Sequence, residues 1–149
     1  MTLIKSISGI RGTIGGKVGD NLTPIDAVKF AAAYGTWLKN NNPNVSKLKV
    51  VVGRDARISG PMVHNLVINT LIGLGIDIID LGLSTTPTVE VAVPLENANG
   101  GIILTASHNP KQWNALKLLN EKGEFLSGAD GEKILEIAEA EAFDFVEVD

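Results

Sequence analysis

The sequence predicts an α/β fold, a three-layer α/β/α sandwich around a mixed, mostly parallel sheet. Two observations lead to this prediction. Short apolar runs occupy 48–53, 76–82 and 100–107, and runs of this length suit strands that are covered on both faces. Helical patterns lie between these runs, and the alternation of strand and helix is typical of right-handed βαβ units.

The first helical pattern has a clear start and a clear end. Thr23 is a good N-cap residue, Pro24 suits the first helical position, and Asp26 brings an acidic group into the first turn. The stretch "NNNPN" at 40–44 stops the pattern. We therefore expect a helix that begins after Thr23 and ends close to residue 40.

Three further helices are expected. Ser59 is a candidate N-cap for the second, whose apolar residues follow helical spacing as far as Leu74. The third lies within 86–97, between two prolines, and the last covers about 129–142. In the last helix, Ile134, Leu135, Ile137 and Ala138 are expected to face the core.

The remaining segments are less regular. The stretch 113–120 followed by "EKGEF" reads as a strand and a turn, which we place antiparallel at an edge of the sheet. The glycine-rich stretch 6–16 is interpreted either as a flexible turn or as a loop that approaches a ligand closely. Residues 1–149 form one domain, and about 143–149 are expected to begin a linker.

Composition excludes several classes of function. A net charge of −4 gives no sign of the basic surface that binds nucleic acids. The absence of cysteine excludes disulfides, thiolate metal sites and cysteine nucleophiles. The start of the chain lacks a signal-peptide pattern, and no apolar run approaches the roughly 18 residues of a membrane helix. We expect a cytoplasmic protein without nucleic-acid or membrane partners.

Polar residues that are able to carry chemistry follow the predicted strands. The stretches "GRDAR" (53–57) and "TASHNP" (105–110) lie at strand carboxyl ends, where open α/β sheets bind ligands. Ser107 is either a turn former or a nucleophile, and a nucleophilic serine needs a base or a metal beside it. His108 is a candidate for proton transfer, Asn109 offers amide donors, and Lys117 lies on the strand that returns from this loop.

Arginines at two other places suit anion binding. Arg11 lies between glycines and is suited to a bidentate grip on phosphate, although the stretch is not a Walker A loop. Arg54, Asp55 and Arg57 either bind an anion or pair with one another, and pairing is the favoured interpretation for Asp55.

Three other titratable residues are given no catalytic role. His64 lies among apolar residues of a predicted helix and is interpreted as structural. Asp77 and Asp80 lie within or beside a strand, and without a third ligand they predict no metal site.

Three motifs, in this order and at this spacing, resemble one enzyme family. "SGIRGT" (8–13), "VGRDAR" (52–57) and "TASHNP" (105–110) are similar to the first domain of the α-D-phosphohexomutases. These include phosphoglucomutase, phosphomannomutase/phosphoglucomutase and phosphoglucosamine mutase. The resemblance spans essentially the whole chain and implies the N-terminal domain of a four-domain enzyme.

The resemblance also implies roles for individual residues. Ser107 would be the phosphorylated serine and, through its phosphoryl group, a ligand of Mg²⁺, with three aspartates from the second domain. His108 would move a proton or contact substrate. Lys117 would act as a general acid or base, and Arg11 would lie near the phosphoserine. Arg11, Asn109 and Lys117 would bind the phosphate.

The implied reaction is an intramolecular phosphotransfer, which places the enzyme among the isomerases of carbohydrate metabolism. It would interconvert hexose 1-phosphate and hexose 6-phosphate, of glucose, mannose or glucosamine, through a bisphosphate. The partners would be a phosphosugar and domains 2–4 of the same polypeptide, and this chain alone would be inactive. The alternative is a non-catalytic module that binds phosphate or another anion. Two positions depart from the family pattern: "NALK" (114–117) replaces an "NGFK"-like segment, and Ser8 replaces an acidic residue.

Overall fold

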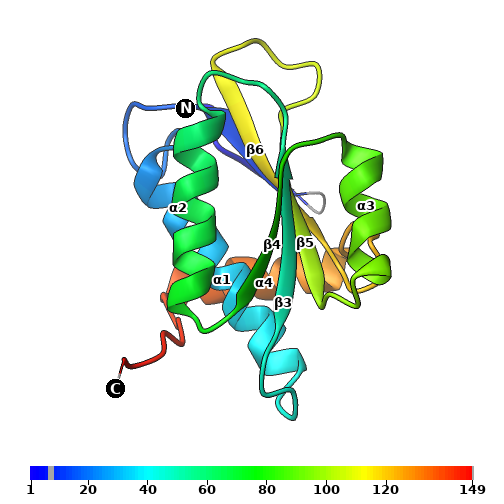
Figure 1. Ribbon diagram of the computed structural model, residues 1–149. Helices are drawn as coiled ribbons and strands as arrows, with labels where there is room; N and C mark the ends of the chain where they lie inside the picture. Colours follow the sequence, from blue (N-terminus) through cyan, green and yellow to red (C-terminus); the bar gives the residue numbers. More distant parts are fainter. Residues whose placement is uncertain (7–8, 149) are drawn as a thin grey trace.

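A computed structural model describes residues 1–6 and 9–148. Six strands and four helices are assigned in this part of the chain, and Figure 1 shows their arrangement. In chain order they are β1 (Ile4–Ser6), β2 (Gly9–Thr13), α1 (Pro24–Asn41), β3 (Lys49–Arg54), α2 (Gly60–Gly73), β4 (Asp77–Leu83), α3 (Thr86–Leu95), β5 (Gly100–Leu104), β6 (Trp113–Leu119) and α4 (Gly128–Ala140). The predicted α/β class is confirmed.

The six strands form one mixed sheet with the order β1-β2-β6-β5-β3-β4. The pairs β3–β4 and β3–β5 are parallel, whereas β5–β6, β2–β6 and β1–β2 are antiparallel. It follows that β2, β3, β4 and β5 point in one direction, and β1 and β6 point in the other. Most strands therefore share an orientation, although most neighbouring pairs are antiparallel.

Two expectations about the sheet are corrected. The strand at 113–119 is antiparallel as predicted, but it lies between β5 and β2 in the interior of the sheet, not at an edge. The stretch 6–16 is not simply a flexible turn, because β2 pairs with β6 over its whole length. Ser8 and its neighbour at position 7 lie outside the described residues. Adding β2 to the sheet covers the edge that β6 would otherwise expose.

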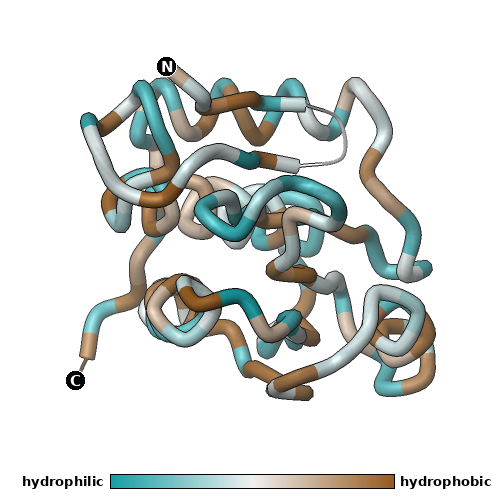
Figure 2. The backbone as a smooth tube through the Cα atoms, turned by 90° about the horizontal axis from the view of Figure 1, so that it is seen from above, coloured by the Kyte–Doolittle hydropathy of each residue, from teal (hydrophilic) through white to brown (hydrophobic). Residues whose placement is uncertain are grey.

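Helices cover both faces of the sheet unequally. The larger core lies under α1, α2 and α4, and the smaller one lies under α3 on the other face (Figure 1). Seen from above, the helices alternate between hydrophobic and hydrophilic segments, as amphipathic helices packed on a sheet do (Figure 2). The predicted three-layer arrangement is thus present: α1, α2 and α4 form one helical layer, and α3 alone forms the other.

The first helix begins as predicted, whereas the second begins differently. The Thr23 side chain accepts a hydrogen bond from the Asp26 N–H, and the Asp26 carboxylate accepts one from the Thr23 N–H, which completes a capping box. Ser59 precedes α2 but makes no side-chain cap. Its hydroxyl accepts a hydrogen bond from Asn114 Nδ2 at 2.9 Å instead, which ties the start of α2 to β6.

Element boundaries differ from prediction where polar residues follow apolar ones. The strand expected over 100–107 ends at Leu104, so the next residues leave the sheet as a loop. The helix α4 is as expected, with Ile134 and Ala138 buried and the other two apolar residues packed against the core. The segment 143–148 has no regular structure but is attached to the domain, since the Asp144 carboxylate pairs with Lys39 at 2.9 Å. In the described part of the chain, no helix has the length and apolar character to cross a membrane.

Candidate functional site

The predicted site residues meet in one pocket at the carboxyl end of β5. The pocket has a volume of about 310 Å³. All five residues named from the sequence contribute to its wall, and the lining consists of Ser6, Gly9, Arg11, Ala106, Ser107, His108, Asn109, Ala115 and Lys117. Two regions far apart in the sequence supply these residues: β1 and β2 near the start of the chain, and the loop 105–112 after β5 together with β6, which follows it. We call residues 105–112 the Ser107 loop.

Lys117 and Ser107 are in direct contact. Lys117 Nζ donates a hydrogen bond to Ser107 Oγ at 2.5 Å. The contact follows from sheet order, because β6 returns antiparallel beside β5 and carries Lys117 back alongside the end of that strand. An ammonium group at this distance stabilises negative charge on the serine oxygen or on a group attached to it.

Arg11 brings a second positive charge to the same pocket. It lies on β2, where it pairs with Ala115 of β6, two residues from Lys117. Its side chain is exposed, and no described residue forms a hydrogen bond or ion pair with its guanidinium. An arginine with free donors beside a serine suits the bidentate binding of a phosphate or carboxylate.

His108 and Asn109 complete the polar wall. His108 is exposed and directly follows Ser107 in the loop. The Asn109 N–H donates to the Ala106 carbonyl at 2.9 Å, which closes a tight turn around Ser107. Ser107 itself has a φ of 50°, in the left-handed region that non-glycine residues rarely adopt. This turn directs the serine side chain toward Lys117 and not along the strand.

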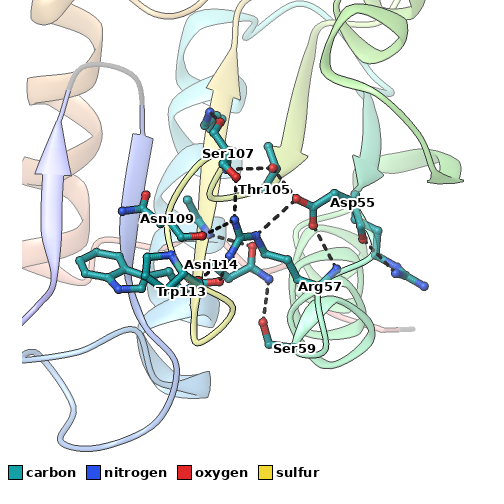
Figure 3. Close-up of polar contacts among 12 residues, drawn as sticks. Asp55, Arg57, Ser59, Thr105, Ser107, Asn109, Trp113 and Asn114 are labelled. Carbon is teal, nitrogen blue, oxygen red and sulfur yellow. Dashed lines mark hydrogen bonds and ion pairs between the residues drawn. The ribbon is translucent and has the colours of Figure 1, made fainter.

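Residues of "GRDAR" support this turn (Figure 3). The Ser107 N–H donates to Thr105 Oγ1 at 3.1 Å, and the Thr105 hydroxyl donates to Asp55 Oδ2 at 2.5 Å. Asp55 also pairs with Arg57 Nε at 3.4 Å. The interpretation of Asp55 as part of a local salt bridge is confirmed. Thr105 lies within the quoted motif, but no role was predicted for it.

Comparisons with known proteins agree with these features. A family profile described as "Phosphoglucomutase/phosphomannomutase, alpha/beta/alpha domain I" matches residues 3–145. The chain belongs to this family. The predicted resemblance to the first domain of the α-D-phosphohexomutases is therefore confirmed.

Relatives of this family carry several mutase names. A phosphoglucomutase/phosphomannomutase of Thermococcus kodakarensis is 42% identical over 114 residues, which is 75% of this chain and 25% of that protein. A probable phosphoglucosamine mutase of Pyrococcus horikoshii is 43% identical over 116 residues, 78% of this chain and 23% of that protein. The chain thus spans about a quarter of the length of the curated relatives it matches.

Solved structures of the family share the fold. A putative phosphomannomutase from Thermus thermophilus superposes with a TM-score of 0.80 at 27% identity, covering 93% of this chain and 30% of that one. A phosphoglucomutase/phosphomannomutase family protein from Burkholderia thailandensis gives a TM-score of 0.78 at 24% identity, over 95% and 31%. The fold of this chain therefore occurs as one part, about 30%, of each of these larger solved proteins.

Titratable residues outside the pocket form a separate pair. His64 Nε2 lies 2.8 Å from Asp80 Oδ1, on the face of the sheet that carries α2. Burial raises the pKa of Asp80, but hydrogen bonds from His64 and the Gly82 N–H, with the charges of His64 and Arg54, outweigh it and leave that pKa below 3.8. His64 therefore binds another side chain, in keeping with a structural role. Within residues 1–6 and 9–148, no group of three or more potential ligands is arranged to hold a metal ion.

Proposed function

We propose that Ser107 is the phosphoryl carrier of a phosphohexomutase, and that this chain acts as the first domain of a longer polypeptide with that activity. The contact between Lys117 Nζ and Ser107 Oγ, inside a pocket that also holds Arg11, is the observation that carries the proposal. Membership of a family of sugar-phosphate mutases supports it.

In this proposal the serine oxygen accepts and donates one phosphoryl group in turn. Phospho-Ser107 transfers the group to a hydroxyl of a hexose 1-phosphate or 6-phosphate, and the P–O bond to the serine breaks as the bond to the sugar oxygen forms. The bisphosphate then turns over, and its other phosphate returns to Ser107. Phosphoryl transfer depends mainly on positioning and charge stabilisation, which a fixed loop and nearby cations supply.

The cations of the pocket suit this reaction. A phosphoserine carries a charge of about −1.5 to −2, and Lys117 and Arg11 together offset a charge of that size. As an ammonium group that donates to Ser107 Oγ, Lys117 is placed to give a proton to the serine oxygen as the phosphoryl group leaves, and, once neutral, to take it back when the group returns, which is a general acid–base role. We assign His108 to proton transfer or substrate contact and Asn109 to support of the phosphate.

In this proposal, Ser107 is the only described residue that would bind Mg²⁺, through its phosphoryl group. Mg²⁺ prefers oxygen ligands, whereas the side chains that contact or flank the serine oxygen here are mainly cationic. The Asp55 carboxylate behind the loop is already bonded to Thr105 and Arg57. The described residues therefore do not form a magnesium site alone, and the phosphoryl group on Ser107 would be their one contribution. When bound, the ion would neutralise charge on the transferred phosphoryl group.

The decisive test is a serine variant in the full-length polypeptide. Mass spectrometry should find one phosphoryl group on Ser107 of the purified protein, and Ser107→Ala should abolish mutase turnover. Ser46→Ala, an exposed serine in the loop after α1, is the matched control and should retain activity. Normal turnover by Ser107→Ala would refute the mechanism.

The isolated chain separates the two functions considered from the sequence. A mutase domain should show negligible turnover alone, because the remaining domains supply the metal carboxylates and bind the sugar. A stand-alone anion-binding module would bind inorganic phosphate in this pocket, while the full-length Ser107→Ala variant would keep the activity of the wild type. Appreciable turnover by the 149-residue chain would contradict the division of labour proposed here.

A further inference from the structure

Both terminal nitrogens of the Arg57 guanidinium are bound to backbone carbonyl oxygens of the protein, directly behind the loop that carries Ser107. Its Nη1 donates to the carbonyl oxygens of Pro110 at 2.7 Å and Trp113 at 3.0 Å. Its Nη2 donates to those of Ser107 at 2.9 Å and Asn109 at 2.9 Å. Figure 3 shows one guanidinium group surrounded by the backbone of the Ser107 loop.

Neither terminal nitrogen of Arg57 has a donor left for a ligand. A guanidinium has five N–H donors, and four of them are used on backbone carbonyls. The fifth, on Nε, is buried and forms an ion pair with the Asp55 carboxylate at 3.4 Å, but it has no hydrogen-bond partner among the described residues. The side chain is only 11% exposed, so a phosphate in the pocket does not reach it. The alternative in which Arg57 binds an anion is therefore disfavoured.

We infer that Arg57 is a positioning residue for Ser107. The inference rests on the proposed function, since it assigns Arg57 the task of holding the phosphoryl carrier in register with Lys117. Arg57 does not touch the reacting atoms. It fixes the path of the backbone that carries them.

The conformation of Ser107 explains why such a residue is needed. A left-handed φ of 50° is unfavourable for serine and persists only where the surroundings enforce it. The carbonyl and the N–H of Ser107 are both linked by hydrogen bonds to residues between β3 and α2, the first directly and the second through Thr105. The carbonyl accepts from Arg57, and the N–H donates to Thr105, whose hydroxyl binds Asp55. The loop is thereby held from both sides of the serine.

Lysine does not reproduce this arrangement. Its ammonium group is a compact charge with three donors, whereas arginine presents a planar fork able to bond several carbonyls at fixed angles. A shift of about 1 Å in a reacting group lowers a rate by about 100-fold. We therefore expect Arg57→Lys to lower kcat of the full-length polypeptide about 100-fold, with the KM for sugar phosphate changed by less than about threefold.

The neighbouring arginine is the matched control. Arg54 lies three residues earlier in the same segment, and its Nη1 donates only to the adjacent Asp55 carbonyl at 3.2 Å. Arg54→Lys should keep the kcat of the wild type. Amide hydrogen exchange gives a second readout: in Arg57→Lys, exchange should accelerate in 106–112 and not in the core strands. Millimolar guanidinium ion should partly restore kcat of Arg57→Ala.

Three results would overturn the inference. An unchanged kcat in Arg57→Lys would remove the positioning role. A raised KM at unchanged kcat would make Arg57 a substrate ligand. Faster exchange throughout the sheet would make the residue generally structural. If no phosphoryl group is ever found on Ser107, the proposed function is refuted. The hydrogen-exchange measurement still tests whether Arg57 holds the loop, because it does not depend on that function.

A threonine pair keeps the inference testable if the Arg57 variants do not fold. Thr105→Val removes the link between the Ser107 N–H and Asp55, whereas Thr105→Ser retains a hydroxyl at the same place. The valine variant should lose kcat and accelerate exchange in the loop, and the serine variant should resemble the wild type. Equal behaviour of the two variants would count against a braced loop.

Discussion

Replacing Gly9 by alanine tests how closely β2 must approach β6. Gly9 is the first residue of β2 and pairs with Lys117. Its φ is +136°, and a Cβ there would lie 2.0 Å from the carbonyl oxygen of Leu116 and 2.9 Å from Lys117 Cα. The obstacle is the backbone of a central strand, so no side chain can move aside to make room. The two strands would have to separate at the pocket.

The expected cost has two parts. Backbone conformations that only glycine adopts readily cost about 1–3 kcal/mol in another residue. Forcing an extra methyl group into packed structure typically adds about 1–3 kcal/mol. We therefore expect Gly9→Ala to destabilise the chain by about 2–6 kcal/mol, a large part of the stability of a domain of this size.

Gly15→Ala isolates the first part. Gly15 also has a positive φ, +90°, but nothing lies within 4 Å of the position its Cβ would take. Its substitution should cost only the backbone part, about 1–3 kcal/mol. The difference between the two variants then measures the clash of β2 with β6.

Urea unfolding followed by circular dichroism measures both free energies. The m-value should stay constant, so that the shift in midpoint reports stability. In the full-length polypeptide, Gly9→Ala should also slow phosphorylation of Ser107, because Lys117 and Arg11 lie on the two strands that are forced apart. Equal losses of stability in Gly9→Ala and Gly15→Ala would refute the steric argument.

Three further predictions concern the core, the surface and the metal. Tyr34→Phe should cost about 1–3 kcal/mol in urea unfolding, because the buried hydroxyl accepts from the Gly101 N–H at 3.0 Å, and burial also raises the pKa of Tyr34. Asp80→Asn should have a lower free energy of unfolding than the wild type at pH about 5, and this difference should shrink as the pH falls below 3.8. The reason is that a carboxyl group whose pKa is lowered by His64 stabilises the fold only while it is ionised. Thermal unfolding should show that Mg²⁺ does not raise the Tm of the chain unless Ser107 is phosphorylated, since a ligand stabilises only the state that it binds.

The sequence is informative where a local pattern determines the structure. Thr23 and Asp26 form the predicted capping box because every group involved lies within four residues. The loop of Ser107 stands out as a candidate site because it follows an apolar strand directly, whereas the role of Ser107 is implied only by the resemblance of "TASHNP" to the family. The partners across the fold were not predicted: nothing in the sequence near Arg57 indicates that its guanidinium binds a loop some fifty residues later. The place of β6 was also missed, because an interior antiparallel strand and an edge strand have similar apolar patterns.

The position of β6 determines what this domain contributes to chemistry. Because β6 lies between β5 and β2, it places Lys117 beside the end of β5 and brings Arg11 of β2 to the same pocket. In a wholly parallel sheet the end of the next strand, and not its start, would lie beside Ser107, and the chain would reach it only after a long crossover. The backbone of Ser107 is held from β3–α2 and its oxygen is contacted from β6. The domain thus holds the serine from two sides and leaves its oxygen facing the pocket lined by Arg11, which under the proposed function would receive the substrate.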